Sequence, residues 1–277
     1  ENLVNANNMK LRMYKSEVDL LIDKTKKLKI SSDNYESNNQ KFENYSMSIF
    51  IVGLPRCGST LVESIISLNT KVKDLGEVNI FEESYREYKQ SEKQKSLSEI
   101  YWKKLEISDN KIITTNKWLF NYQYAGIIAK AIPNAKIIHC YRNPLDNILS
   151  TYRAHFATGN YFSSSLVDSA EVYSDQDEIM RTYKKEFKNH IYSLNYDKLV
   201  THPSDEIKSL IHWLGWSWND LYLSPHLNKR KVSTRSNVQV RSPINTKSLG
   251  GWKNYKEMLK PAMEIITKKD GYKNLKY

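Results

Sequence analysis

Residues suited to binding an anion follow the first apolar segment of the sequence. That segment covers residues 47–53, and the loop after it reads Gly-Leu-Pro-Arg-Cys-Gly-Ser-Thr from Gly53 to Thr60. Gly53 and Gly58 allow a tight turn and a close approach of backbone amides to a ligand. Ser59 and Thr60 can cap the following helix, whose first turn adds unpaired N–H groups. The spacing predicts a strand-to-helix loop that binds a phosphate or a similar anion.

The loop has the spacing of a Walker A motif, but Ser59 stands where that motif has its lysine. A nucleoside triphosphatase needs a cation on the β- and γ-phosphates and a metal ion beside it. The cation of this loop is Arg56, three residues upstream of Ser59. The loop therefore favours a smaller terminal group bound without magnesium, and a turn without any ligand is the alternative.

A second set of anion-binding residues follows another apolar segment, residues 135–141. Arg142 comes directly after it, Pro144 suits the first position of a helix, and Ser150 lies about two helical turns later. An arginine fork and a serine hydroxyl together suit a second phosphate. The alternative is an ordinary pair between Arg142 and Asp146. Two anion sites on adjacent strand ends indicate one ligand that carries phosphates at separate positions.

The elements that must position these residues alternate along the chain. Residues 47–53, 111–115, 135–141 and 190–196 have strand composition. Helical patterns cover residues 59–69, 77–89, 96–107, 119–131, 144–156, 175–188, 204–214 and 254–268. Such alternation implies right-handed βαβ units and a parallel sheet, in which ligands bind at the carboxyl ends of the strands.

The N-terminal part has a different character. Residues 10–29 predict one amphipathic helix, and the polar stretch 31–40 indicates a boundary or a short second helix. We therefore expect a helical segment over residues 1–45 and one α/β domain over residues 46–277. The predicted fold is α/β, a P-loop-type three-layer arrangement of a central parallel sheet flanked by helices.

The composition limits the class of protein to which the chain can belong. The 277 residues suffice for one large α/β domain, and their formal charge of +11 is compatible with an anionic partner or with a lysine-rich solvated surface. Cys57 and Cys140 are too few for a disulfide framework and lack metal-site spacing. No group of His, Cys and Asp residues has the spacing of metal ligands, so we predict no metal. No apolar run approaches the ~20 residues of a membrane span, and the first residues do not resemble a secretory signal.

Taken together, these motifs make the sequence resemble the sulfotransferase superfamily, which uses 3′-phosphoadenosine 5′-phosphosulfate (PAPS). Within it, the chain is most similar to tyrosylprotein sulfotransferases and to bacterial sulfotransferases linked to tetratricopeptide repeats. The loop after residues 47–53 resembles the 5′-phosphosulfate loop, and the segment from Arg142 to Ser150 resembles the 3′-phosphate segment. Further similarity covers Leu75-Gly76-Glu77, Thr115-Asn116-Lys117, residues 194–200 and residues 236–245.

The resemblance implies roles for individual residues. The 5′-phosphosulfate is expected at Arg56, Cys57, Gly58, Ser59 and Thr60, and the 3′-phosphate at Arg142 and Ser150. The adenosine and phosphate sites are expected to be lined by Tyr196, Ser236, Gln239, Arg241 and Asn245. Glu77 is implied as the general base, and Lys117, Arg56 and Ser236 as groups that stabilise the transferred sulfuryl group.

Chemistry supports these residue types. In-line sulfuryl transfer builds negative charge on the leaving phosphate oxygen, which fixed cations such as Lys117 and Arg56 stabilise. A carboxylate such as Glu77 can take the proton of an acceptor hydroxyl. The alternatives are that Glu77 offsets a helix dipole and that Lys117 is a solvated loop lysine. His155 is a rival base and otherwise structural.

The sequence departs from the family pattern at positions that are expected to affect the affinity for the nucleotide. Cys57 replaces the usual serine of the loop, and Gly251 stands where the eukaryotic tyrosine enzymes have a lysine that contacts the nucleotide. Lys247 or Lys253 can compensate. Ala154 replaces an arginine, with Arg153 beside it.

Two further features are interpreted as packing. His139 lies in a predicted buried strand, and we assign it to the core. The tryptophans at positions 213, 216 and 218 are expected to pack beneath the final helices.

The sequence thus predicts a PAPS-dependent sulfotransferase with a hydroxyl acceptor, which is protein tyrosine in an acidic peptide, a carbohydrate or a small molecule. The expected product is adenosine 3′,5′-bisphosphate (PAP). The alternatives are a P-loop kinase, a nucleotide-binding protein that has lost catalysis, and a nucleic-acid binder that uses the positive charge. We expect no nucleic-acid or membrane partner, and a homodimer is left open. The expected location is cytoplasmic for a bacterial protein, and the Golgi lumen only if an upstream anchor has been removed.

Overall fold

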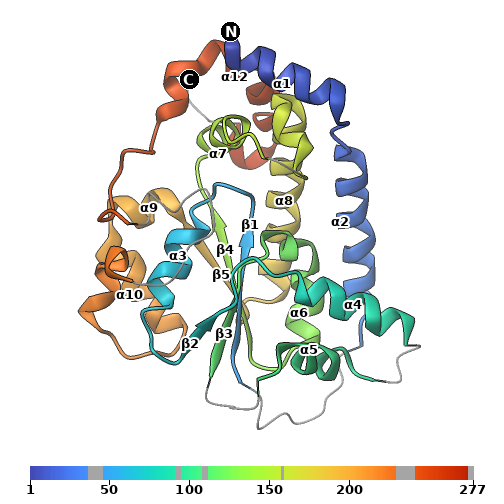
Figure 1. The fold of residues 1–277 in the computed structure, drawn as a ribbon, viewed down its shortest axis with the longest axis vertical. Coiled ribbons are helices and arrows are strands. Elements are labelled where there is room, and N and C mark those ends of the chain that lie inside the picture. Colours follow the sequence, from blue (N-terminus) through green and yellow to red (C-terminus); the bar gives the residue numbers. More distant parts are fainter. Residues whose placement is uncertain (37–45, 92–94, 108–111, 157–158, 229–240, 274–277) are drawn as a thin grey trace.

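A parallel sheet of five strands runs through the centre of the chain (Figure 1). The computed structural model describes residues 1–36, 46–91, 95–107, 112–156, 159–228 and 241–273. The strands lie in the order β2-β3-β1-β4-β5, and every neighbouring pair is parallel. Their bounds are β1 Ser48–Gly53, β2 Val72–Asp74, β3 Ile113–Asn116, β4 Ala135–Tyr141 and β5 Ile191–Asn195. The predicted α/β fold with a parallel central sheet is confirmed.

Helices connect the strands and cover both faces of the sheet. The α-helices are α1 Asn2–Met13, α2 Val18–Asp33, α3 Ser59–Ile66, α4 Ile80–Gln90, α5 Leu97–Leu105, α6 Ala125–Ala131, α7 Pro144–Tyr152, α8 Leu166–Glu186, α9 Tyr196–Thr201, α10 Pro203–Trp213 and α12 Lys256–Ile266. Short 3₁₀ helices are η1 Leu119–Tyr124, η2 Tyr161–Ser164, η3 Asp220–Leu223, η4 Pro225–Leu227, η5 Gly251–Tyr255 and η6 Asp270–Tyr272.

Alternation along the buried strands divides the core into two clusters. Phe50 and Val52 of β1 point into a cluster that includes side chains of α2, α4–α8 and α12. Ile49 and Ile51 point to the opposite face, where they meet α3, α9 and α10. Every residue of β1 is buried. Its sequence therefore lacks the alternation of apolar and polar residues that is typical of a half-exposed strand. The sheet is therefore the middle of three layers (Figure 1).

The N-terminal prediction of one helix over residues 10–29 is wrong, because the structure has two. Helix α1 ends at Met13, and α2 begins at Val18 after Glu17 adopts a left-handed backbone with φ of 55°. Tyr14 stacks on Tyr161 with ring centroids 4.8 Å apart. Helix α1 thus packs on η2, whereas α2 packs along α8 and η1. These tertiary contacts divide a stretch whose apolar spacing is continuous.

Other boundaries also differ from the predicted ones. Strand β2 and helix α9 have no counterpart among the predicted elements, and β2 is a short edge strand rich in charge. Helix α8 begins at Leu166, nine residues before its predicted start, where the side chain of Ser165 accepts a hydrogen bond from the amide of Asp168. The predicted helix over residues 119–131 is a 3₁₀ turn followed by α6.

The residues interpreted as packing are buried or partly buried, with one correction. His139 is 6% exposed, lies 2.6 Å from the Gln176 side chain, and has its pKa lowered to about 3 by burial, so it is a neutral core residue. The three tryptophans pack against the cluster that contains α10. They do not lie beneath the final helix α12, which belongs to the other cluster.

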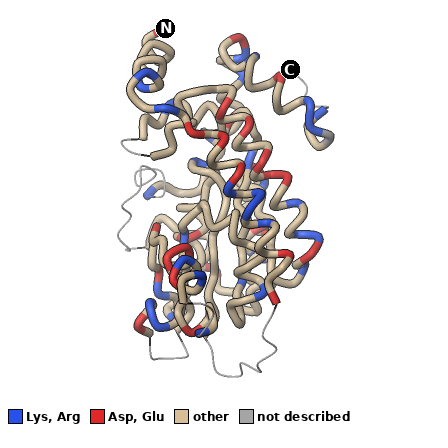
Figure 2. Tube along the Cα trace, turned by 90° about the vertical axis from the view of Figure 1, so that its right-hand side faces the viewer, with Lys and Arg blue, Asp and Glu red and all other residues tan. Residues whose placement is uncertain are grey.

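The surface carries charges of both signs. Figure 2 shows basic and acidic residues interspersed along the long helices in that view. Within the described residues, no helix is long and apolar enough to span a bilayer.

Burial of Asp175 makes the stability of the fold depend on pH. This carboxyl lies in α8 facing α2; its Oδ2 atom is buried without a hydrogen bond, and desolvation raises its pKa to about 6. The protonated form is therefore favoured in the folded state. The stabilisation is present below the unfolded pKa near 4 and is lost as the pH rises through 6.

We expect Asp175→Asn to stabilise the chain by about 1 kcal/mol at pH 7.5, because the partial exposure of the carboxyl reduces the larger value that the shift alone implies. The gain should disappear at pH 4, where the parent carboxyl is protonated. Urea unfolding at both pH values measures the difference. An equal effect of the substitution at both pH values would contradict the prediction.

Candidate active site

The loop after β1 is held against α7 and α9. Side chains of Asn147 and Thr151 donate hydrogen bonds to the carbonyl of Pro55 at 3.1 and 3.2 Å. Arg56 follows with a left-handed backbone, φ of 70°, which turns the chain sharply before α3. This anchoring fixes the loop to a second element that was also predicted to bind an anion.

The glycine at the start of α3 is required by contact as well as by conformation. Gly58 is the N-cap with φ of 96°, and a Cβ atom there would lie 2.2 Å from the ring of Tyr196. The predicted capping by Ser59 and Thr60 is wrong, because both residues lie inside the first turn and no side chain caps the helix. The N-cap residue of α3 thus supplies no side-chain oxygen to the first-turn amides.

Arg142 forms the centre of the second predicted site. Its side chain is 6% exposed, and its guanidinium donates to the carbonyl of Ser248 at 2.5 Å and lies 4.9 Å from the ring centroid of Tyr196. Carboxylates of Asp146 and Asp197 stand 3.8 and 3.9 Å away. Burial raises the pKa of Asp197, whereas the Asn143 amide and Arg142 oppose that rise. The alternative pairing of Arg142 with Asp146 is therefore present in the structure.

Asp146 and Tyr196 also hold the C-terminal segment, residues 242–251, at the carboxyl end of the sheet. The two carboxylate oxygens of Asp146 accept hydrogen bonds from the amides of Gly250 and Trp252 at 2.7 and 3.0 Å. The hydroxyl of Tyr196 lies 2.7 Å from that of Ser248. Segment 242–251 is thereby pinned beside the loop after β1, although the two lie far apart in sequence.

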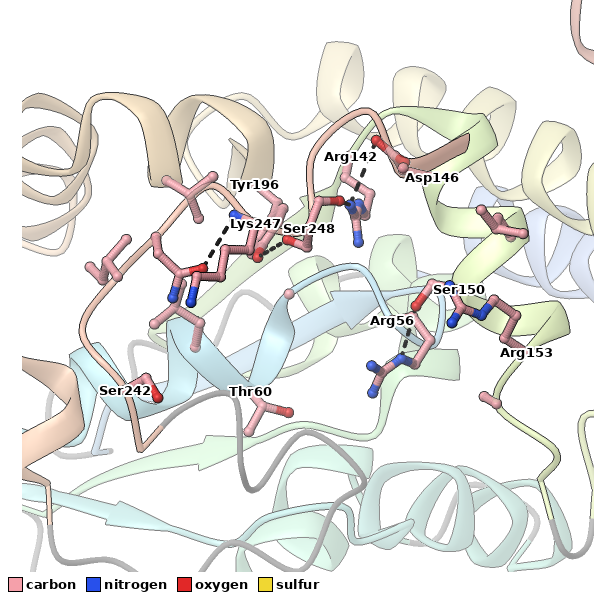
Figure 3. Close-up of a pocket in the computed structure, with 18 of the residues that line it drawn as sticks. Arg56, Thr60, Arg142, Asp146, Ser150, Arg153, Tyr196, Ser242, Lys247 and Ser248 are labelled. Carbon is pink, nitrogen blue, oxygen red and sulfur yellow. Dashed lines mark hydrogen bonds and ion pairs between the residues drawn. The ribbon is translucent and has the colours of Figure 1, made fainter. Parts of the chain in front are cut away.

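A cavity of about 700 Å³ opens between these parts (Figure 3). Four cationic side chains line it, those of Arg56, Arg142, Arg153 and Lys247. Asp146 is the acidic residue in the lining, and it is engaged with Arg142 and two amides. A cavity with this excess of positive charge suits a ligand with several anionic groups. The described residues contain no cluster that could hold a metal ion.

A second group of charged residues lies beyond the loop, at the ends of β2 and β3. Lys117 follows β3 and is 1% exposed, and its ammonium lies 2.6 Å from the carboxylate of Glu77. Glu63 of α3, also 1% exposed, stands 3.7 Å from the same ammonium. The Lys117 amide donates to the carbonyl of Gly76 at 2.8 Å, which fixes the two loops to each other. Lys117 is therefore not a solvated loop lysine.

The predicted site residues fall into three groups. Those lining the cavity are Arg56, Gly58, Thr60, Arg142, Ser150, Tyr196 and Asn245. Cys57, Ser59, Arg241, Glu77 and Lys117 do not line it. Cys57 is buried in the core cluster with Cys140, and Arg241 is exposed with its guanidinium on the carbonyl of Asn228. Ser236 and Gln239 lie outside the described residues.

Ser150 has a partner that was not predicted from the sequence. Its hydroxyl accepts a hydrogen bond from Nε of Arg56 at 3.1 Å, and Figure 3 shows the two side chains together. The hydroxyl thus links the first predicted anion site to the second. Of the two lysines considered as compensators, Lys247 lines the cavity and Lys253 does not.

Two residues of this region were missed in the sequence. Ser248 contacts both Arg142 and Tyr196 but has no distinctive pattern around it. Glu63 did carry a signal, because it is the one charged residue in the eight-residue helix α3. A carboxylate in an otherwise uncharged helix is fully buried only when it is paired, so the buried Glu63 requires a cation nearby.

The sheet order, the loop after β1 and the cationic cavity at the carboxyl ends define a P-loop-type α/β protein. Among solved structures, the sulfotransferase domain of the Synechococcus PCC 7002 olefin synthase is similar, with a TM-score of 0.58, 14% identity, and coverage of 79% of this chain and 91% of that one. A mouse sulfotransferase complexed with PAP has a TM-score of 0.55, 17% identity and coverage of 89% of both chains. These similarities concern the fold.

Sequence comparisons give the family. A family model described as "Sulfotransferase family" matches residues 92–220. An uncharacterized protein of Aquifex aeolicus is 31% identical over 253 residues, which are 82% of this chain and 33% of that protein. Protein-tyrosine sulfotransferase 1 of Danio rerio is 24% identical over 74% of this chain and 65% of its own length. The chain spans a third to two thirds of these relatives, and it is a member of the sulfotransferase superfamily.

The contact between Gly58 and Tyr196 can be tested without any ligand. We expect Gly58→Ala to lower the free energy of unfolding by about 2–4 kcal/mol, because backbone strain and a steric clash add. Gly215→Ala is the matched control. Gly215 also has a positive φ, of 74°, but a Cβ atom there meets nothing within 4 Å. The control should cost about 1 kcal/mol from strain alone.

Urea unfolding measures both variants. In the background of Tyr196→Ala, where the ring is absent, the cost of Gly58→Ala should fall to that of the control. Equal costs for the two glycine variants in the parent background would contradict the proposed contact.

Proposed function

We propose that this chain transfers a sulfuryl group from PAPS to a hydroxyl acceptor. The observation that carries the proposal is the cavity at the carboxyl ends of β1, β4 and β5, where four cations from four separate segments converge. Membership of the sulfotransferase superfamily supplies the reaction class. The mouse sulfotransferase of similar fold forms a complex with PAP, which supports the choice of nucleotide.

Within this proposal, the cavity holds the two ends of the nucleotide. Arg56, Gly58 and Thr60 would bind the 5′-phosphosulfate, and Arg142 and Ser150 the 3′-phosphate. Arg142 already donates to the Ser248 carbonyl, so its remaining N–H groups are the ones that would meet a phosphate. Cys57 would help to shape the loop, because its side chain is buried in the core and its amide donates to the carbonyl of Leu54 at 3.2 Å.

The transfer step is an in-line displacement. An acceptor oxygen attacks the sulfur atom, the bond between sulfur and the 5′-phosphate oxygen breaks, and Glu77 takes the hydroxyl proton. PAP and the sulfated acceptor are the products. The 48% exposure of the Glu77 side chain supports this role, because a base must reach the acceptor. Lys117 and Arg56 would stabilise the charge that develops during transfer.

Nucleotide binding is tested by isothermal titration with PAP. We expect the parent to bind PAP more tightly than adenosine 5′-phosphate, since a 3′-phosphate adds charge-assisted hydrogen bonds. Lys247→Ala and Arg153→Ala should each weaken PAP binding about three- to tenfold, because each removes one exposed cation from the cavity. Lys253→Ala is the matched control, since this nearby exposed lysine does not line the cavity.

A folded parent that does not bind PAP would contradict the proposed function. A Lys253→Ala effect as large as that of Lys247→Ala would instead indicate unspecific charge attraction. Magnesium-dependent turnover of ATP would favour the kinase hypothesis.

The base is tested with Glu77→Gln. We expect kcat to fall by about 10²–10⁴ while the dissociation constant of PAP stays within twofold, because the carboxylate acts on the acceptor. Glu83→Gln, an exposed carboxylate in the first turn of α4, is the control and should leave kcat unchanged. Sulfate transfer is followed with labelled PAPS, with acidic tyrosine peptides first and glycans and small phenols next. A kcat within threefold of the parent would exclude Glu77 as the base.

A further inference from the structure

We infer that Glu63 is a positioning residue for Lys117, an inference that rests on the proposed function. Neither the loop motif nor the family pattern assigned a role to this residue. Its side chain and that of Lys117 are each 1% exposed, and the carboxylate lies 3.7 Å from the ammonium. An ammonium buried to this extent is strongly destabilised unless a negative group stays close to it.

Lys117 has two carboxylate neighbours of different character. Glu77 is closer, at 2.6 Å, but its side chain is 48% exposed. Glu63 is more distant but fully enclosed within α3, which is packed on the sheet. One partner is accessible to an acceptor, and the other is accessible to neither acceptor nor solvent.

The proposed reaction requires this division of roles. When Glu77 takes the acceptor proton it becomes neutral, and its attraction for Lys117 weakens. Glu63 then remains as the buried negative charge, so the pair of Glu63 and Lys117 stays neutral overall and the ammonium keeps its place. The Lys117 ammonium is therefore still in position at the moment when charge builds on the leaving phosphate.

The backbone around Lys117 is fixed in advance, which leaves the side chain as the part to be held. The Asn116 side chain is fully buried, donates to the carbonyl of Val78 at 3.1 Å and accepts from the Trp118 amide at 3.0 Å. The long lysine side chain retains rotatable bonds that these contacts do not restrict. Two carboxylates restrain it, that of Glu77 at 2.6 Å and that of Glu63, from within α3, at 3.7 Å.

The experiment is a double-mutant cycle of Glu63→Gln and Lys117→Met. The isosteric glutamine removes the charge and keeps the volume. Three quantities are measured for each variant: PAP affinity by titration, turnover of PAPS to PAP with the best acceptor or with water, and unfolding in urea. Glu257→Gln, whose side chain is 84% exposed beside Lys260, is the control for removing a carboxylate.

We expect Glu63→Gln to lower kcat on the order of 10- to 100-fold, as misplacement of a catalytic group does, while the dissociation constant of PAP changes less than threefold. Glu63→Asp should recover part of the loss, because it restores the charge at a greater distance. In the Lys117→Met background, Glu63→Gln should change turnover less than twofold and should destabilise the fold much less than in the parent.

Unchanged kcat in Glu63→Gln, or an equal loss with and without Lys117, would overturn the inference. If the parent binds PAP but one of these two contradicting results is obtained, only the role of Glu63 fails and the proposed function stands. If the parent does not bind PAP, the proposed function fails first. If turnover is too slow to measure, the unfolding cycle decides, and additive effects of the two substitutions count against the pair.

Discussion

The buried guanidinium of Arg142 joins three of the segments that line the cavity. It stands at the end of β4, contacts the ring of Tyr196 at the start of α9, and donates to the carbonyl of Ser248 in the C-terminal segment. Asp146 balances its charge and also accepts the amides of Gly250 and Trp252. These contacts, together with the hydrogen bond between the hydroxyls of Tyr196 and Ser248, attach segment 242–251 to the carboxyl end of the sheet.

The burial of the Arg142 and Lys117 side chains is compensated in the same way, by two carboxylates close to each cation. Arg142 lies between Asp146 and Asp197, and Lys117 lies between Glu63 and Glu77. Removing a charge from water is costly, and opposite charges and hydrogen bonds must offset that cost. Each cation is thereby fixed before a ligand arrives, so that little reorganisation is needed when an anion binds. The cations with fewer constraints, Arg153 and Lys247, are exposed at the cavity.

The N-terminal helices lie near this site although they contain none of the motifs. The buried side chain of Asn7 in α1 donates to the carbonyl of Tyr152, at the end of α7, and Lys10 reaches the carbonyl of Phe156. Between these two carbonyls lie Arg153 and Ala154, which line the cavity. Helix α1 therefore supports the segment that forms one wall, while α2 covers α8.

The parallel α/β fold could be predicted from the amino-acid sequence, because apolar strand segments alternate with amphipathic helices and local periodicity is enough to show this. The cavity residues that directly follow β1 and β4 could be predicted too, since the carboxyl ends of neighbouring parallel strands must meet. Three-dimensional packing was needed to show that Glu63 faces Lys117, that Ser150 pairs with Arg56 and that Gly58 lies against Tyr196. These pairs join residues far apart along the chain, and their distances depend on how helices pack on the sheet. Packing also divided the N-terminal helix in two, a result that local periodicity does not encode.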